Sequence, residues 1–452
     1  MSLMERLEKQ KKQTQTPADI SKDAGRHNAA PLPPQDDHQQ LKESVHNEVI
    51  DIINREASKL ESEDEKGEFI RSAIESVVNI KASDIPRAAR ARICSELYND
   101  IVGLGPLEEL LSNPDISEIM VNGPDNVYVE MKGKLTKTDV HFNDDEHVMN
   151  VINRIVSSIG RHIDESSPMV DARLADGSRV NAIIPPCALS GPTITIRKFS
   201  KNPLTVSDLV RFQSLSPKMV SFLEACVKGK LNIVVSGGTG SGKTTLLSVL
   251  SAYIPENERI VTIEDAAELQ LRQNHVITLE SKPPNVEGKG AVTIRDLVKN
   301  ALRMRPDRIV VGEVRSGEAL DMLQAMNTGH DGSLTTAHAN TPRDLVSRLE
   351  TMVLMAGFDM PIKAIREQIS SALDLVVQQS RLRDGSRKIV SISEVVGMEG
   401  DTITLQDIFV YKHTGFGPDG NSGGFVATGV RPNFAEKLID NGVKINEDWF
   451  RN

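Results

Sequence analysis

The sequence is poor in aromatic residues, cysteine and long apolar stretches, and each shortage excludes a class of protein. Aromatic residues make up 4% of the 452 residues, with a single tryptophan, so we do not expect an aromatic-rich recognition surface. The three cysteines, Cys94, Cys187 and Cys226, contain no C-x-x-C pair, which excludes a four-cysteine zinc module and favours reduced thiols. No apolar run reaches the roughly 18 residues that a membrane span needs. The first residues also lack the apolar core of a signal peptide, so we expect a cytoplasmic protein.

Charge and length narrow the choice further. The formal net charge is −10 at pH 7, which argues against direct nucleic-acid binding as the main activity. A length of 452 residues predicts about three domains.

The hydrophobic pattern changes four times along the chain. Residues 1–37, with mixed charge and a proline cluster, predict a disordered tail. Three apolar stripes at helical spacing then predict a three-helix bundle over residues 38–102; they run from Leu41 to Leu60, from Phe69 to Val78 and from Ala89 to Ile101. Mixed helices and strands predict an α+β domain over residues 103–198, followed by a linker at 199–206.

Residues 207–452 predict the largest domain. Strands expected at 233–236, 260–264, 309–311 and 334–336 alternate with helices, and most of them are rich in Val and Ile. Such runs are typical of a parallel sheet that is buried on both faces. Strands expected at 389–395, 403–411 and 424–427 predict an antiparallel end piece, and a helix is expected at 433–441.

A glycine-rich loop follows the first of these parallel strands and opens a helix. The motif is G-x-x-x-x-G-K-[ST], in the strand–loop–helix context that it requires. Glycines let consecutive N–H groups point at phosphate oxygens, the lysine reaches the β- and γ-phosphates, and the hydroxyl ligates Mg²⁺. The residues predicted to bind nucleotide are Gly237, Gly238, Thr239, Gly240, Ser241, Gly242, Lys243, Thr244 and Thr245.

Carboxylates follow the next two parallel strands. Glu264 and Asp265 end the strand at 260–264, and with Thr244 we expect them to support Mg²⁺. Glu313 ends the strand at 309–311, directly after Gly312, which takes the place of the Asp common in such proteins. We predict that Glu313 is the general base. The alternative is that these acids only begin helices, where the dipole favours them.

Histidines and arginines supply the remaining candidates. His330 and His338 flank the strand at 334–336 and suit phosphate sensing or a subunit contact better than metal binding, since no third ligand is near. Arg173, Arg179 and Arg197 lie in the α+β domain and are candidates for stabilising a transferred phosphoryl group, although surface arginines without a special role are the default.

Four motifs in this order resemble the hexameric ATPases of the secretion and type IV pilus superfamily. They are GGTGSGKTT at 237–245, TIEDAAEL at 262–269, RIVVGEVR at 308–315 and TGHDGSLTTAHAN at 328–340. Within the superfamily, the chain is most similar to the motors of Tad (tight adherence, Flp) pili, the CpaF-type ATPases. The segments that carry this similarity are GLGPLEELL, SEIMVNG, DARLADGSRVNAIIPP, TITIRKF and LQDIF.

The resemblance implies a fold, a cofactor and partners. The fold is α/β, with a RecA-like phosphate-loop domain preceded by a PAS-like α+β domain and the helical bundle. The implied assembly is a homo-hexamer that binds ATP and Mg²⁺ between the two domains. In it, Glu313 and Glu264 are catalytic glutamates, and His330 and His338 form a histidine box. Three arginines act from a neighbouring subunit: Arg173, Arg179 and Arg197.

The implied location is the cytoplasmic face of the inner membrane. There the motor would act on membrane-embedded pilus platform proteins, and on pilin only indirectly. A type IV or type II secretion ATPase is the first alternative, a DNA translocase the second, and a scaffold without activity the third.

Overall fold

The computed structural model describes residues 39–56, 63–131, 133–199, 203–284, 288–417 and 420–451. The predicted disordered tail, Leu60 and part of the predicted linker lie outside the described residues. Contacts divide the chain into two units. The first comprises the chain up to Ser112 with residues 124–127 and 137–154, and the second comprises the remainder.

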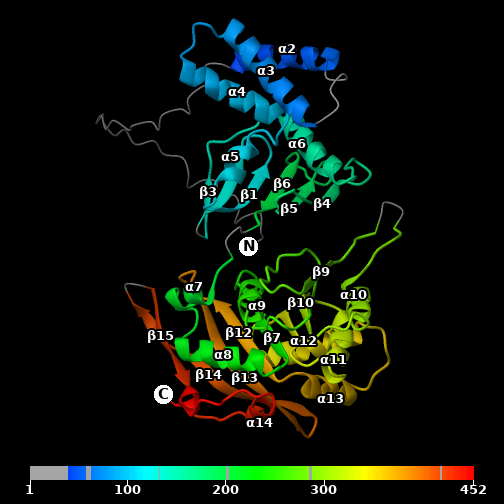
Figure 1. Ribbon diagram of the computed structural model, residues 1–452, viewed down its shortest axis with the longest axis vertical. Helices are drawn as coiled ribbons and strands as arrows, with labels where there is room; N and C mark the ends of the chain where they lie inside the picture. The colour runs from blue at the N-terminus through cyan, green and yellow to red at the C-terminus, as the bar shows by residue number, and fades with distance from the viewer. Residues whose placement is uncertain are drawn as a thin grey trace, which may run out of the picture. The chain divides into compact units, whose positions relative to one another are not determined.

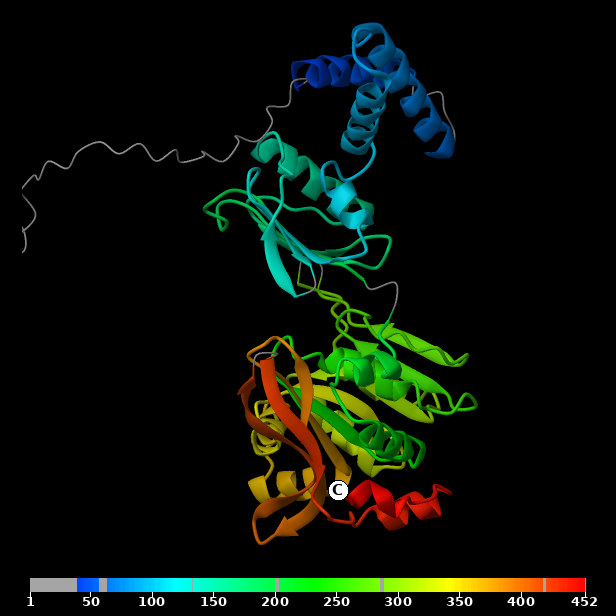
Figure 2. The same ribbon diagram turned by 90° about the vertical axis from the view of Figure 1, so that its left-hand side faces the viewer.

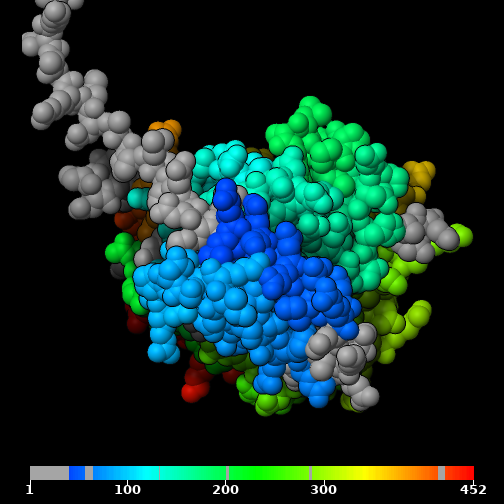
Figure 3. All heavy atoms as spheres, turned by 90° about the horizontal axis from the view of Figure 1, so that it is seen from above, coloured from blue at the N-terminus to red at the C-terminus, as the bar shows by residue number. Residues whose placement is uncertain are grey.

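Three helices at the start of the first unit share one apolar core. They are α2 (Gln39–Glu56), α3 (Glu63–Lys81) and α4 (Arg87–Ile101). Val49, Ile74 and Val78 are fully buried between them, and Ile93 and Leu97 nearly so. In Figure 3 the three helices, in shades of blue, form one continuous body. The apolar stripes read from the sequence therefore mark the faces that pack together.

A six-stranded sheet follows, in the order β3-β2-β1-β6-β5-β4. Its strands are β1 (Ile116–Asn122), β2 (Val127–Met131), β3 (Lys134–Lys137), β4 (Met169–Arg173), β5 (Arg179–Ile183) and β6 (Thr193–Arg197). Helix α5 (Leu107–Ser112) precedes the strands along the chain, and α6 (Asp145–Ser158) separates β3 from β4. Alternate residues of β6, Ile194 and Ile196, are buried, as expected where one face of a sheet covers a core.

The rest of the second unit is built on a nine-stranded sheet in the order β15-β14-β13-β12-β7-β11-β10-β8-β9 (Figure 1). The strands are β7 (Ile233–Gly237), β8 (Ile260–Glu264), β9 (Val276–Glu280), β10 (Arg308–Val314), β11 (Leu334–His338), β12 (Leu375–Arg381), β13 (Arg387–Glu399), β14 (Thr402–Gly417) and β15 (Gly420–Ala427). Neighbours from β12 to β9 run parallel, whereas β12 to β15 pair antiparallel. Figure 2 shows β13–β15, in orange to red, continuing the sheet.

Helices cover both faces of this sheet. They are α7 (Val206–Arg211), α8 (Pro217–Lys228), α9 (Lys243–Ser251), α10 (Ile294–Ala301), α11 (Glu318–Asn327), α12 (Pro342–Leu354), α13 (Ile362–Ala372), α14 (Ala435–Asp440) and the 3₁₀ turn η2 (Glu447–Phe450). Ile233 and Val235 of β7 pack with α8, α9, α14 and η2, whereas Val234 packs with α10–α13. Because successive side chains of a strand point to opposite faces, a wholly apolar strand needs both layers.

The structure confirms the predicted strands of the parallel sheet and the antiparallel pairing after residue 389, but it contains strands that the sequence did not predict. These are β3, β4, β9 and β12. Strand β12 carries Gln378 and Gln379, whose side chains are buried and break the apolar pattern. None of the described helices is long and apolar enough to cross a membrane. The three cysteines form no disulfide.

Candidate functional site

The glycine-rich loop joins β7 to α9 at the carboxyl edge of the parallel strands. Gly237 pairs with Gln379 of β12, and a Cβ added at Gly237 would lie 2.2 Å from the Gln379 carbonyl oxygen. Gly240 and Gly242 have φ angles of +70° and +94°, in the left-handed region that favours glycine. The buried Ser241 Oγ has no hydrogen-bond partner among the described residues. The Ser241 hydroxyl is therefore available to a ligand that lies in the loop.

Lys243 begins α9 and points back over this loop. Its side chain is buried, and Nζ donates a hydrogen bond to the Gly238 carbonyl oxygen at 3.0 Å. Nζ also lies 3.3 Å from Nδ1 of His338. Burial lowers the pKa of the Lys243 amine, and Glu313 offsets part of this effect. Phosphate oxygens are stronger acceptors than a carbonyl oxygen, so this lysine is placed to exchange one for the other.

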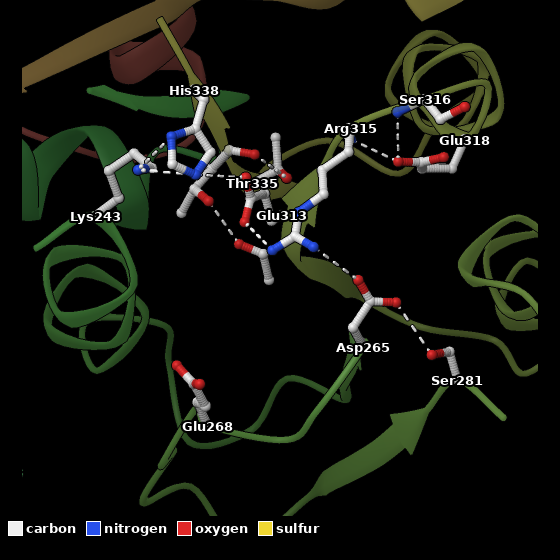
Figure 4. A network of polar contacts seen from close by, with 12 residues as sticks. Lys243, Asp265, Glu268, Ser281, Glu313, Arg315, Ser316, Glu318, Thr335 and His338 are labelled. Carbon is white, nitrogen blue, oxygen red and sulfur yellow. Dashed lines mark hydrogen bonds and ion pairs between the residues drawn. The ribbon is translucent and has the colours of Figure 1, made fainter. Parts of the chain in front are cut away.

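Glu313 lies between two basic side chains beside the loop (Figure 4). Its Oε1 is 2.9 Å from Nε2 of His338, at the end of β11, and its Oε2 accepts from Nη2 of Arg315 at 2.7 Å. Burial lowers the pKa of the His338 imidazole, although Glu313 acts in the opposite direction. Two strands that are adjacent in the sheet, β10 and β11, thus bring the predicted base next to His338 and Lys243.

Arg315 also reaches the carboxylate that follows β8. Its Nη1 is 3.4 Å from Oδ2 of Asp265, whose Oδ1 accepts from Ser281 Oγ at 3.1 Å. The backbone N–H of Arg315 donates to Oε1 of Glu318 at 2.6 Å. Arg315 therefore links the ends of β10 and β8, and in Figure 4 it lies between Glu313 and Asp265.

Position 312 is restricted to glycine because Glu264 fills the space that a side chain would need. A Cβ added at Gly312 would lie 2.8 Å from Cγ of Glu264, on the neighbouring strand β8. The Glu264 carboxylate accepts from the N–H groups of Glu268 and Leu269 at 3.1 and 3.2 Å. Burial nevertheless raises the pKa of Glu264 to about 7. A carboxyl group is therefore present where the sequence shows only glycine, supplied by the next strand.

The predicted ligands of Mg²⁺, Thr244, Glu264 and Asp265, each have a different environment. Among the residues that the structure describes, no group of three His, Cys, Asp or Glu side chains is arranged to hold a metal ion. Thr244 lies in the first turn of α9, Glu264 bonds to backbone amides and Asp265 pairs with Arg315. The protein alone therefore offers single oxygen ligands, as expected where most ligands of Mg²⁺ are phosphate and water oxygens.

The three predicted arginines divide into two groups, all within the second unit. Nη1 of Arg179 lies 3.1 Å from Oε1 of Glu268, and Nη1 of Arg197 lies 3.9 Å from the same oxygen. Both arginines line an open pocket of about 260 Å³. The pocket is lined by Gly177, Arg179, Arg197, Lys198, Phe199, Pro203, Leu204, Thr244, Thr245, Ser248, Glu268 and Gln270. Arg173 instead pairs with Glu280 at 2.8 Å and does not line the pocket.

The structure separates the two predicted histidines. Strand β11 lies between them and runs parallel to β7, so His338 is at the carboxyl edge with Lys243 and His330 is at the opposite edge. The Ser333 hydroxyl donates to the His330 carbonyl oxygen there, at 2.8 Å. His338 is therefore beside Lys243 and Glu313, whereas His330 is not. The predicted role of His330 in phosphate sensing or a subunit contact stays a prediction.

Sequence reasoning missed the residues that flank the loop from β12 and β13. Arg387 Nε donates to the Gly240 carbonyl oxygen at 3.0 Å, and Gln379 pairs with Gly237. The available signal was three arginines, Arg381, Arg383 and Arg387, around the Asp384–Gly385 turn. Only the long-range pairing of β12 with β7 shows that this hairpin meets the loop.

The sequence is similar to a described protein family and to several relatives. Residues 100–405 match the model of the family described as "Type II/IV secretion system protein". A putative conjugal transfer protein of Mycobacterium tuberculosis, Rv3659c, is 36% identical over 310 residues, which is 67% of this chain and 88% of that protein. The type IV secretion system protein VirB11 of Brucella suis is 33% identical over 316 residues, which is 64% of this chain and 88% of that protein.

Two solved structures are also similar. The VirB11 ATPase from the Brucella suis type IV secretion system, in complex with sulphate, is 32% identical over 64% of this chain and 95% of its own, with a TM-score of 0.36. The pilus retraction motor PilT with bound ADP is 19% identical over 75% of this chain and 86% of its own, with a TM-score of 0.48.

A phosphate loop on a parallel sheet, with acidic residues on adjacent strand ends, defines the phosphate-loop nucleotide-binding class. Within that class, the chain belongs to the type II/IV secretion system ATPase family.

Proposed function

We propose that this chain is a magnesium-dependent ATP hydrolase that works as a motor. The observation that carries the proposal is the arrangement of Glu313, His338 and Lys243 beside the phosphate loop, with successive contacts of 2.9 and 3.3 Å. One cluster thereby contains a carboxylate that can act as base, a histidine that contacts this carboxylate and a phosphate-binding lysine. This is what in-line attack of water on a terminal phosphate requires.

The loop fits the triphosphate of ATP. Lys243 now donates to a loop carbonyl oxygen, and Ser241 Oγ is buried without a partner among the described residues. Both groups are donors, and a phosphate in the loop offers each of them an acceptor oxygen. Thr244 would hold Mg²⁺ through its hydroxyl, with Glu264 and Asp265 supporting the shell of water around it. Bound ATP supplies the anhydride whose hydrolysis releases the energy.

Glu313 is the residue that takes the proton of the attacking water. His338 contacts one carboxylate oxygen and Arg315 bonds the other, so the rotamer of Glu313 is fixed before substrate arrives. A base that is already oriented keeps the reaction rate high, because no orientational entropy is lost when it meets the attacking water. Removing a general base typically slows a reaction about 10²- to 10⁴-fold.

The pocket lined by Arg179 and Arg197 supports a second part of the proposal. It borders Thr244 and Thr245 of α9, so a nucleotide in the loop extends toward it. We assign this pocket to the ribose and base, with Phe199 and Leu204 as apolar contacts. The two arginines are also the candidates for completing the phosphate site, within the chain or across subunits of a hexamer.

The motor that we propose drives assembly of a Tad pilus. It acts through inner-membrane platform proteins and makes no direct contact with nucleic acid. The sequence segments shared with CpaF-type ATPases support this reading, as does the absence of a four-cysteine zinc module. A secretion or conjugation ATPase is the second candidate, because relatives are named as conjugal transfer and type IV secretion proteins. Loss of surface pili after Glu313→Gln would support the first, and loss of effector or DNA export with pili intact would support the second.

Assembly into a ring has its own test. The steady-state ATPase rate is measured against protein concentration, together with light scattering with and without ATP. Activity that rises cooperatively as a hexamer forms is the expected result. Full activity in a monomer would overturn the ring mechanism and leave the hydrolase in place.

A further inference from the structure

The hairpin formed by β12 and β13 places two arginines beside the phosphate loop. Strand β12 runs parallel to β7 with Gln379 opposite Gly237, so Arg381 lies two residues further on, next to the loop. Antiparallel pairing then puts Arg387 of β13 directly opposite Arg381. A Cβ added at Gly242 would lie 3.2 Å from Cδ of Arg387, and one added at Gly240 would lie 3.8 Å from Nη1 of Arg381. The hairpin is therefore in contact with the loop.

The charges of this pair are not balanced by the protein. Among the described residues, neither Arg381 nor Arg387 forms an ion pair with a carboxylate. Like charges directly opposite one another destabilise a strand pair. Arg387 donates from Nε to the Gly240 carbonyl oxygen at 3.0 Å and thereby holds the tip of the loop. Two unpaired guanidinium groups at this position are suited to a polyanion in the loop.

The residues that follow Arg387 contact a different element. Lys388 is buried, and its Nζ donates to the carbonyl oxygens of Gln213 and Phe212 at 2.7 and 3.3 Å. The N–H of Ile389 donates to the Ser214 carbonyl oxygen at 2.9 Å. These carbonyl groups follow the carboxyl end of α7, which is the first helix after residues 203–205. Three consecutive residues thus hold the phosphate loop on one side and the end of α7 on the other.

We propose that Arg387–Ile389 couples occupancy of the phosphate loop to the anchoring of the segment 206–214, with Arg387 as the positioning residue. The proposal rests on nucleotide binding at this loop. A phosphate in the loop attracts the Arg387 guanidinium, and any shift of Arg387 is passed along the backbone to Lys388 and Ile389. Coupling of this kind is reciprocal. The free energy by which bound nucleotide stabilises the anchored segment equals the free energy by which anchoring of the segment strengthens nucleotide binding.

The test uses the full chain and Mg·ADP as the probe. Fluorescence titration with a labelled ADP gives the Kd, and hydrogen exchange of the amides of residues 209–214 is followed with and without saturating Mg·ADP. The variants are Arg387→Ala, Arg387→Lys as the conservative change and Arg431→Ala as the matched control. Arg431 is an exposed arginine whose partner is Glu447.

In the wild type and in Arg431→Ala, ADP is expected to slow exchange at 209–214 by about tenfold. Arg387→Ala weakens ADP binding by about tenfold and loses the nucleotide-dependent protection at saturation, and Arg387→Lys recovers part of the affinity. Lys388→Met, which keeps the arginine on the loop, removes the protection as well.

Two failures are distinguishable. A wild type that binds no ADP overturns the proposed function, and this inference with it. A wild type that binds ADP, alongside an Arg387→Ala variant with the same Kd and the same protection, overturns the coupling alone.

Discussion

The buried carboxyl of Glu264 predicts a pH dependence of stability whose size follows from its position. Burial raises the pKa of Glu264 from an ordinary value of 4.5 to about 7 in the folded protein. A raised carboxyl pKa means that the folded state keeps a proton that the unfolded state releases. Its contribution is therefore fully present below pH 4.5 and is lost as pH rises to about 7. At about 1.4 kcal/mol per pKa unit, the loss is ~3 kcal/mol.

Replacing Glu264 by Gln removes this titration and keeps the shape of the side chain. Urea unfolding of both proteins is followed by the fluorescence of Trp449, the single tryptophan, which is buried in the second unit. Between pH 5 and pH 8, Glu264→Gln is expected to gain ~2–3 kcal/mol of unfolding free energy relative to wild type. Other titrating groups occur in both proteins and cancel. If the difference in unfolding free energy between the two proteins stays constant from pH 5 to pH 8, the Glu264 carboxyl is not held protonated by burial.

Three further substitutions test the geometry of the site. His338→Ala should lower kcat roughly 100-fold, because Glu313 loses one of its two contacts. His330→Ala changes a residue at the other edge of the sheet and should keep the wild-type kcat. Equal effects of the two substitutions in a coupled ATPase assay would contradict their separation by β11. Arg179→Ala should raise KM for ATP about tenfold with a smaller change in kcat, since the arginine lines the pocket beside α9; an unchanged KM in the same assay would remove the pocket from the nucleotide site.

The parts of the site that could be predicted from the sequence are local. The phosphate loop needs only a strand, glycines at fixed positions and a helix start, all of which lie within Ile233–Ser251. Glu313 was found because an acidic residue at a strand end is visible in a short window. The all-apolar strands likewise predicted a sheet with helices on both faces.

The parts that escaped prediction depend on which strands are neighbours. Glu264 fills the space over Gly312 because β8 and β10 are adjacent, and no short segment contains that fact. Arg387 reaches Gly240 only because β12 pairs with β7 over a long separation in sequence. Strand β12 itself was missed because the buried Gln378 and Gln379 hide its pattern; Gln378 Nε2 donates to the carbonyl oxygens of Ala339 and Asn340.

The central claim is that Lys243 binds the phosphates and Glu313 activates the water. The most direct measurement compares ATP affinity by calorimetry with the hydrolysis rate for wild type, Lys243→Ala and Glu313→Gln. The account predicts that Lys243→Ala loses binding, and that Glu313→Gln binds ATP normally but hydrolyses it about 10²- to 10⁴-fold more slowly. Near-normal affinity in Lys243→Ala, or unchanged turnover in Glu313→Gln, would contradict it.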